Sequence, residues 1–198
     1  MKRWKCTICN YVHEGDAPPE KCPICNAPAS KFVEIEPAPA EAVPDAPPAR
    51  PAPVTILDKI KAFMVKHHLH PVSVHFPNGL LPVVVTFFIL SLVFNSASMA
   101  KAGFYNLVFI LLSLPLVLVA GYVEWEKKYN RALTTLFQIK IVAAAITTVL
   151  CLVSTVWFLF QPDVVSSSNA GIFIAINIVM LASAGIAGFI GGKLVFKD

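Results

Sequence analysis

Hydrophobic residues gather in four long runs after residue 70. The runs cover residues 72–94, 104–123, 141–160 and 171–192, and each contains few charged side chains. A helix of about 20 apolar residues crosses a hydrocarbon core some 30 Å thick. The pattern therefore predicts four transmembrane helices within residues 71–198, packed as an all-α membrane four-helix bundle.

A shorter amphipathic segment precedes the first run, within residues 54–70. Apolar side chains such as Ile56, Ile60 and Phe63 recur there at helical spacing, with lysines between them. Thr55 followed three residues later by Asp58 resembles a capping box, a common start of a helix. We expect an interfacial amphipathic helix in this segment.

The first 53 residues have a different character. Residues 37–53 contain seven prolines and six alanines, a composition that packs no core and favours a semi-rigid polyproline II tether. Residues 1–36 carry five basic and five acidic side chains and four of the five cysteines. The sequence thus predicts a small domain at 1–36, a Pro/Ala-rich linker at 37–53, the interfacial helix at 54–70 and the membrane domain at 71–198.

Composition agrees with a membrane protein and excludes one class of partner. Hydrophobic residues make up 56% of the chain and charged residues only 14%, which is too apolar for an ordinary soluble domain. The net charge of +4 arises in the membrane part. Because no Arg/Lys-rich run is interleaved with aromatic residues, we expect no nucleic-acid binding.

The distribution of Lys and Arg predicts the orientation in the membrane. Nine of them lie in residues 54–71, 124–140 and 193–198, whereas the two other connections hold only Lys101. By the positive-inside rule, both termini face the cytoplasm from a multi-pass cytoplasmic (inner) membrane protein. The start MKRWKCTICN has no apolar core of a signal peptide, which agrees with thiols kept in a reducing compartment.

The cysteines form two C-x-x-C pairs: Cys6 with Cys9, and Cys22 with Cys25. In a reducing compartment this pattern indicates a metal site rather than disulfides. Four thiolates in a tetrahedron suit zinc or a mononuclear iron, and the spacing alone does not choose between them.

The residues around the cysteines resemble the rubredoxin-like domain of rubrerythrins. Asn10 and Asn26 follow the two pairs at positions expected to need a left-handed backbone, which Asn tolerates. The resemblance implies a small fold of short β-strands and loops that holds one iron as Fe(Cys)4 and relays single electrons. It covers about 36 residues and includes, besides the cysteines, Trp4, Tyr11, His13, Gly15, Pro18, Pro19, Pro23, Pro28 and Phe32.

The first membrane segment opens with the phrase HPVSVHFPNGLL. It resembles an uncharacterised family of four-helix bacterial membrane proteins with the signature HPxxVHFP, a resemblance that implies a fold and no activity. Pro77 and Pro82 fall within the predicted helix. Because proline has no N–H to donate, we expect this end of the helix to be kinked or partly unwound.

Four residues near one side of the membrane are candidate cofactor-binding residues: His70, His75, Glu124 and Lys140. Ionisable side chains at such depth need partners, and Glu124 is the expected partner of His75. A haem b bound by His70 or His75 is one interpretation. A single-histidine haem, a His–Lys140 pair, a homodimer that shares histidines, a quinone pocket and a purely structural bundle are the alternatives.

Two functions remain open at this stage. The first is a membrane-anchored electron carrier that takes electrons from a soluble reductase and passes them to a membrane acceptor, whether haem, quinone or partner enzyme. The second is a zinc-ribbon module on a structural or transport-associated membrane protein. Glu-x-x-His, the ligand pattern of a di-iron bundle, is absent from the sequence, so we expect a carrier rather than a turnover enzyme of the rubrerythrin kind.

Overall fold

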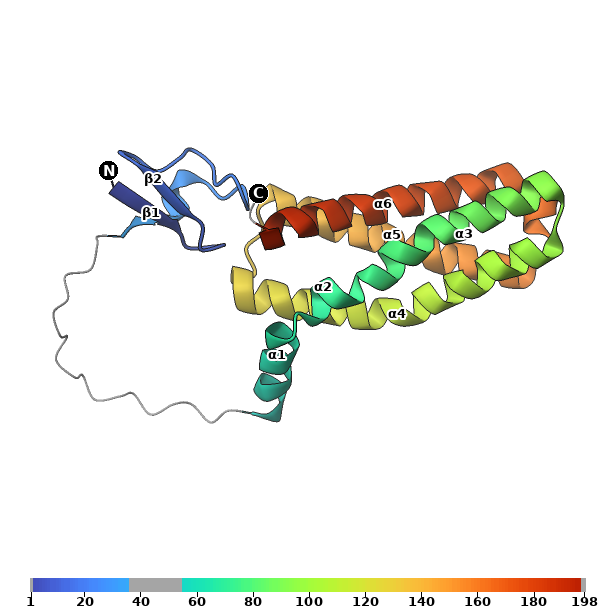
Figure 1. Ribbon diagram of the computed structural model, residues 1–198, viewed down its shortest axis with the longest axis horizontal. Coiled ribbons are helices and arrows are strands. Elements are labelled where there is room, and N and C mark those ends of the chain that lie inside the picture. The colour runs from blue at the N-terminus through green and yellow to red at the C-terminus, as the bar shows by residue number, and fades with distance from the viewer. Residues whose placement is uncertain (1, 36–54, 197–198) are drawn as a thin grey trace.

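The computed structural model describes residues 2–35 and 55–196, the side chain of the last residue excepted. It consists of a small β domain beside one end of a long helical bundle (Figure 1). The predicted linker at 37–53 lies outside the described residues.

The small domain is built on a three-stranded antiparallel sheet with the order β2-β1-β3. The strands are β1 (Lys2–Cys6), β2 (Val12–Gly15) and β3 (Phe32–Glu34), and a short 3-10 helix covers Ala29–Lys31. Strand β1 brings Cys6 opposite Phe32 of β3. The predicted small domain of short strands and loops is confirmed.

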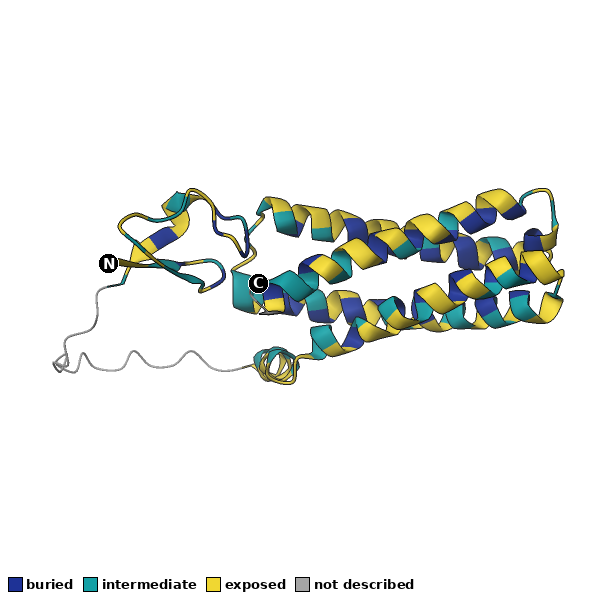
Figure 2. Cartoon of the chain, turned by 45° about the horizontal axis from the view of Figure 1, so that its top comes forward, coloured by how far each residue is buried: buried dark blue, intermediate teal, exposed yellow. Residues whose placement is uncertain are grey.

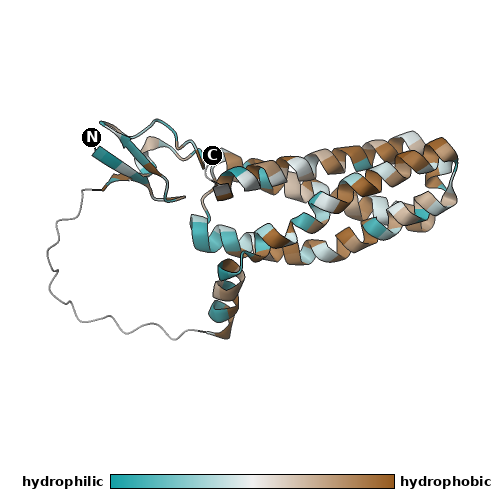
Figure 3. Cartoon of the chain, viewed as in Figure 1, coloured by the Kyte–Doolittle hydropathy of each residue, from teal (hydrophilic) through white to brown (hydrophobic). Residues whose placement is uncertain are grey.

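Six α-helices follow in residues 55–196: α1 (Ile56–Lys66), α2 (Leu69–Ser73), α3 (His75–Phe94), α4 (Ala97–Tyr129), α5 (Thr135–Phe160) and α6 (Ala170–Phe196). A 3-10 turn at Val164–Ser166 joins α5 to α6. In the four-helix bundle, α3 and α5 each pack against both α4 and α6. Four helical spans within the described residues are long and apolar enough to cross a membrane, as predicted. Hydrophobic residues cover their outward faces, where lipid would lie (Figure 3).

Aromatic packing fills the part of the bundle far from the small domain. The rings of Phe88 and Phe173 meet edge to face with centroids 5.0 Å apart, and those of Phe104 and Phe158 stack at 4.5 Å. Gly103 lies directly against Phe88: a Cβ there would approach the ring to 2.7 Å. Close packing of this kind holds helices together where lipid gives no hydrophobic driving force between them.

The first membrane span is broken near its start, as the prolines predicted. Helix α2 ends at Ser73, α3 begins at His75, and Val74 lies between them. The carbonyl of Ser73 would pair with residue 77, but that residue is Pro77. Val74 itself keeps helical dihedral angles, and its carbonyl still accepts from the N–H of Asn78 at 3.1 Å.

Helix α1 lies crosswise to the long axis of the bundle (Figures 1 and 2). Thr55 and Asp58 form the predicted capping box. Lys61 of α1 bonds Glu126 of α4 at 2.6 Å, while Ile56 is 78% exposed on its apolar face. This orientation suits a helix in the membrane interface, with its apolar side chains toward the acyl chains.

Candidate metal centre

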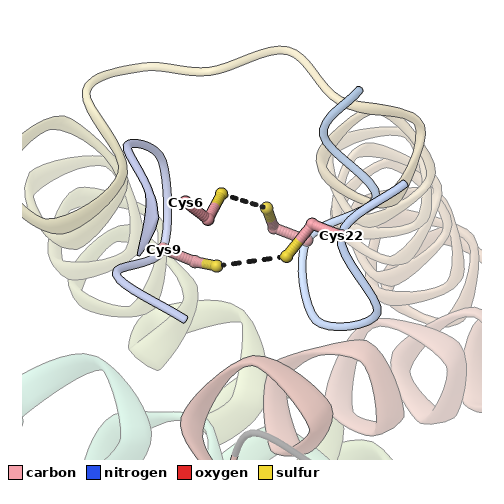
Figure 4. Close-up of side chains that lie close together, drawn as sticks. Cys6, Cys9 and Cys22 are labelled. Atoms are coloured by element: carbon pink, nitrogen blue, oxygen red, sulfur yellow. Dashed lines mark hydrogen bonds between the residues drawn. The ribbon is translucent and has the colours of Figure 1, made fainter. Parts of the chain in front are cut away.

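The four cysteines of the small domain converge on one point. Their sulfur atoms all lie within 4.8 Å of one another, and they point toward one another between two loops (Figure 4). The Sγ atoms of Cys6 and Cys25 are 3.8 Å apart and those of Cys9 and Cys22 are 3.5 Å apart. A tetrahedral site with metal–sulfur bonds of about 2.3 Å has sulfurs about 3.8 Å apart. The arrangement fits a single four-coordinate metal ion.

Each pair of cysteines sits on a tight turn closed by an asparagine. The N–H of Asn10 donates to the carbonyl of Cys6, and that of Asn26 donates to the carbonyl of Cys22, both at 2.9 Å. Asn10 has φ of 60° and Asn26 has φ of 61°. The predicted left-handed conformations are confirmed, and they let both turns aim their sulfurs inward.

Burial and mutual hydrogen bonding shift the pKa values of the thiols in different directions. Hydrogen bonding to Cys25 lowers the pKa of Cys9 to about 5, against the opposing effect of burial. Desolvation raises the pKa of Cys22 to about 11, and the bond to Cys9 together with burial raises that of Cys25. The four sulfurs therefore need a cation to ionise together, and metal binding would release protons.

The metal centre packs directly against the membrane bundle. We call the adjoining end of the bundle the proximal end; it comprises α2, the last turns of α4, the first turns of α5 and the last turns of α6. The four cysteines share one buried cluster with Phe137 of α5 and with Ile190 and Leu194 of α6. Trp125 and Tyr129 of α4 pack against that cluster, and the rings of Tyr129 and Phe137 lie 4.9 Å apart.

Three of the four candidate cofactor-binding residues gather inside the proximal end. Glu124 is 8% exposed and bonds Lys128 at 2.5 Å. His70 lies within electrostatic reach of Glu124, Lys128 and Lys140, and its Nδ1 is 3.2 Å from the carbonyl of Val117. We name His70, Glu124, Lys128 and Lys140 the proximal charge cluster.

The expected pairing of His75 with Glu124 is wrong. His75 is exposed, and its Nδ1 lies 2.7 Å from the carbonyl of Pro71, one turn earlier in the same segment. Residues five apart lie about 140° apart around a helix, so when α2 packs His70 against α4, His75 points to a different side. The two histidines therefore do not face each other as axial ligands of one haem would.

Glycines make room for the polar side chains of the proximal end. A Cβ on Gly121 would come within 2.9 Å of the His70 ring, and one on Gly188 within 2.6 Å of the Asn78 amide. At Gly191 a Cβ would lie 3.5 Å from the ammonium of Lys140, an ordinary contact, which shows only that Lys140 of α5 lies close to α6. Phe137, which belongs to the same buried cluster as the cysteines, and Tyr129, which packs against that cluster, were not among the sequence candidates. Aromatic residues at a helix end are common at membrane interfaces and carry no specific signal.

Comparisons with known proteins match both parts of the chain. Residues 4–33 match the family described as Rubrerythrin, rubredoxin-like domain, and residues 66–198 match the family Predicted membrane protein (DUF2231). No solved structure matches the chain significantly.

Two curated relatives are similar to the small domain. Reverse rubrerythrin-1 of Clostridium acetobutylicum is 50% identical over 36 residues, 18% of this chain and 20% of that protein. Rubrerythrin of Nitratidesulfovibrio vulgaris is 50% identical over 30 residues, 15% of this chain and 16% of that protein. The chain thus covers only a fifth or less of these relatives. Because the membrane match extends over more than half of the chain, this protein belongs to the DUF2231 family of predicted membrane proteins, and it carries a rubredoxin-like domain of the rubrerythrin type at its amino-terminal end.

Proposed function

We propose that this protein is a membrane-anchored electron-transfer protein of the rubredoxin type, a carrier rather than a turnover enzyme. One observation carries the proposal: the four cysteines and three residues of the bundle form a single buried cluster. A metal that only held a small fold would need no contact with membrane helices. A redox centre gains from it, because the contact places the donor next to the membrane.

The four thiolates fill every position of a tetrahedral metal site, so no substrate reaches the metal. When bound, iron supplies a one-electron Fe(III)/Fe(II) couple there. The rubredoxin-like match of residues 4–33 favours iron over zinc. Phe32, 8% exposed, and the partly buried rings of Trp4 and Tyr11 exclude water around the sulfurs, and such a shell tunes the reduction potential.

Tyr129 and Phe137 form the contact layer between the thiolates and the bundle. The hydroxyl of Tyr129 donates to the carbonyl of Leu194 at 3.3 Å, which fixes the ring between α4 and α6. Phe137 is 4% exposed. Both rings pack in the cluster that joins the cysteines to α5 and α6, and they exclude water from that part of the contact.

The proximal charge cluster supports a proton-handling role at the same end. Glu124 is buried, whereas the side chain of its partner Lys128 is 33% exposed. This pair connects the interior, with His70 and Lys140, to the aqueous phase. Protons that accompany electrons to a membrane acceptor would pass along it.

The remaining parts of the proposal concern partners and orientation. The Lys and Arg distribution supports a proximal end that faces the cytoplasm, where a soluble reductase would donate electrons. The acceptor is a redox molecule or enzyme of the cytoplasmic membrane. Because His70 and His75 do not converge, the geometry favours an acceptor other than a haem held by both histidines.

The test uses the full chain in lipid nanodiscs. We expect stoichiometric iron, a visible charge-transfer spectrum that is bleached on reduction, and reoxidation by quinone dissolved in the same nanodiscs. A Tyr129→Leu change is expected to slow this reoxidation while reoxidation by soluble ferricyanide stays the same. A colourless protein with stoichiometric zinc overturns the proposal.

The two histidines supply a matched control. His70→Ala is expected to slow quinone-dependent reoxidation because it removes a member of the proximal charge cluster, whereas His75→Ala leaves it unchanged because His75 bonds only its own segment. Equal rates in both variants would remove the cluster from the proposed proton route.

A further inference from the structure

We propose that the protein binds a membrane-borne quinone at the boundary between the metal centre and α5. The quinone ring would lie in a polar cleft beside the cysteine loops, and its isoprenoid tail would lie in an apolar groove between α5 and α6. This inference rests on the proposed electron-transfer function for its redox role, but the binding site itself is independent of it.

The first observation is a cleft of about 540 Å³ between the small domain and the connection from α4 to α5. Its lining includes Ile8, Asn26 and Lys31 of the small domain and Asn130, Thr134 and Gln138 of the bundle. In sequence, Ile8 lies between two metal-binding cysteines and Asn26 directly follows the fourth. A molecule in the cleft would therefore contact the loops that hold the metal.

The second observation is an apolar groove of about 310 Å³ on the bundle surface. Val142 and Ile146 of α5 and Ile186 of α6 line it, and all three are exposed on the apolar, lipid-facing part of the membrane spans. Gln138 lines both the groove and the cleft. The two spaces therefore adjoin at one side chain, with the polar one beside the metal centre and the apolar one facing lipid.

The volumes lie within the range of small-molecule sites, roughly 300–1,000 Å³. An occupant that fits both spaces is amphipathic, with a compact polar ring and an apolar tail. Asn130 and Gln138 place amide groups in the lining of the cleft, and an amide N–H is a suitable donor to a ring carbonyl.

The charge of the cleft favours a quinone over a phospholipid headgroup. Amides and hydroxyls supply most of its polar groups, and Lys31 is the one charged side chain among its lining residues. Phosphate is usually held by several cationic groups, whereas neutral ring carbonyls need only such donors. Reduction of a quinone to a quinol takes two electrons, delivered singly from the ferrous site and renewed by the soluble reductase, and two protons drawn from the aqueous phase.

Binding can be measured without any electron transfer. The full chain, loaded with zinc in lipid nanodiscs, is titrated with a menaquinone that carries a four-isoprene tail and with menadione, which has the same ring and no tail; tryptophan quenching reports occupancy. Val142→Trp fills the groove, and we expect about tenfold weaker binding of the tailed quinone, equivalent to about 1.4 kcal/mol, with menadione unaffected.

Val149→Trp is the matched control, because Val149 and Val142 are both 57% exposed on α5 and Val149 does not line the groove. It is expected to leave both affinities unchanged, whereas Gln138→Leu weakens both. Equal affinities of Val142→Trp and Val149→Trp for the tailed quinone overturn the proposed site. So does native mass spectrometry that finds a phospholipid retained on the chain at saturating quinone.

The iron-loaded chain separates the two proposals. If the quinone binds to the zinc form as expected but does not reoxidise the reduced iron form, the site stands and the electron-transfer function fails. If reoxidation is normal and Val142→Trp changes neither binding nor rate, electron transfer stands and this site fails.

Discussion

The small domain and the membrane bundle bury their polar groups in different ways. The small domain concentrates four thiols at one point, where all four cysteines are at most 7% exposed. The bundle instead keeps a mixed cluster of charges at its proximal end and fills its other half with aromatic rings. The structure of the small domain therefore depends on a bound metal ion, whereas the bundle depends on its own charged side chains.

This difference has a consequence for stability. A domain of fewer than about 40 residues rarely folds without a metal or disulfides, and the described small domain spans residues 2–35. The bundle draws its stability from helix packing within the bilayer. We expect the small domain and the bundle to unfold separately, although they share one buried cluster.

The largest expected effect follows from removing a metal ligand. Cys22→Ser leaves three thiolates, so we expect loss of the metal and unfolding of the small domain, while the bundle keeps its helical content. Metal analysis and thermal unfolding followed by circular dichroism check this. Cys151→Ser is the control, since that buried cysteine lies in α5 and outside the metal centre. A small domain that stays folded without metal would contradict the comparison.

The next effect concerns the charges of the bundle. Glu124→Ala leaves Lys128 and Lys140 near His70 without their counter-charge, and breaking a buried ion pair costs up to about 3–5 kcal/mol. Because Lys128 can turn toward water, we expect the free energy of unfolding to fall by an amount near the lower figure. Unfolding of the protein in detergent measures this change. Adding Lys128→Met to the variant should restore part of the loss. No recovery would mean that Glu124 acts through packing alone.

The two regions also differ in how far sequence could predict them. The metal centre is local in sequence: two C-x-x-C pairs, with Asn10 and Asn26 at the left-handed positions, specify it almost completely. The capping box of Thr55 and Asp58 is local as well. Spacing of this kind leaves few alternatives: the convergence of the four sulfurs, the two left-handed turns and the capping box are all confirmed.

The proximal end depends on distant segments and was harder to predict. His70 and His75 are both flanked by apolar residues, and which of them faces α4 depends on how α2 packs against α4, which a hydropathy pattern does not show. The cleft at Thr134 and Gln138 needs the small domain beside α5. No periodicity in either segment specifies that contact.

A smaller effect tests the contact between the two regions. Ile8 packs against the shared cluster, so Ile8→Asp is expected to weaken docking and slow quinone-dependent reoxidation about tenfold, or about 1.4 kcal/mol. The iron spectrum should not change, because the cysteines are untouched. Val33→Asp, at a position 48% exposed on β3, is the matched control. Equal rates in the two variants would show that docking does not limit the transfer.

The smallest effect concerns α1. This helix lies outside the metal centre, and a capping box stabilises its first turn. Hydrogen bonds from the Thr55 side chain and backbone, together with nearby Lys127 and Lys61, hold the pKa of Asp58 below its ordinary value of 3.8. Because the folded pKa is the lower one, this stabilisation is present above about pH 4 and is lost as the pH falls through the folded value.

Hydrogen exchange of the first turn of α1, corrected for intrinsic rates, should therefore quicken in acid. Thr55→Ala should weaken the turn by about 1 kcal/mol and reduce its pH dependence, because the Thr55 side chain is the first cause of the lowered pKa, whereas D58N should remove the pH dependence entirely. A first turn equally protected at pH 3 and pH 6 in the unmodified chain would mean that packing on α4, and not the cap, holds this helix in place.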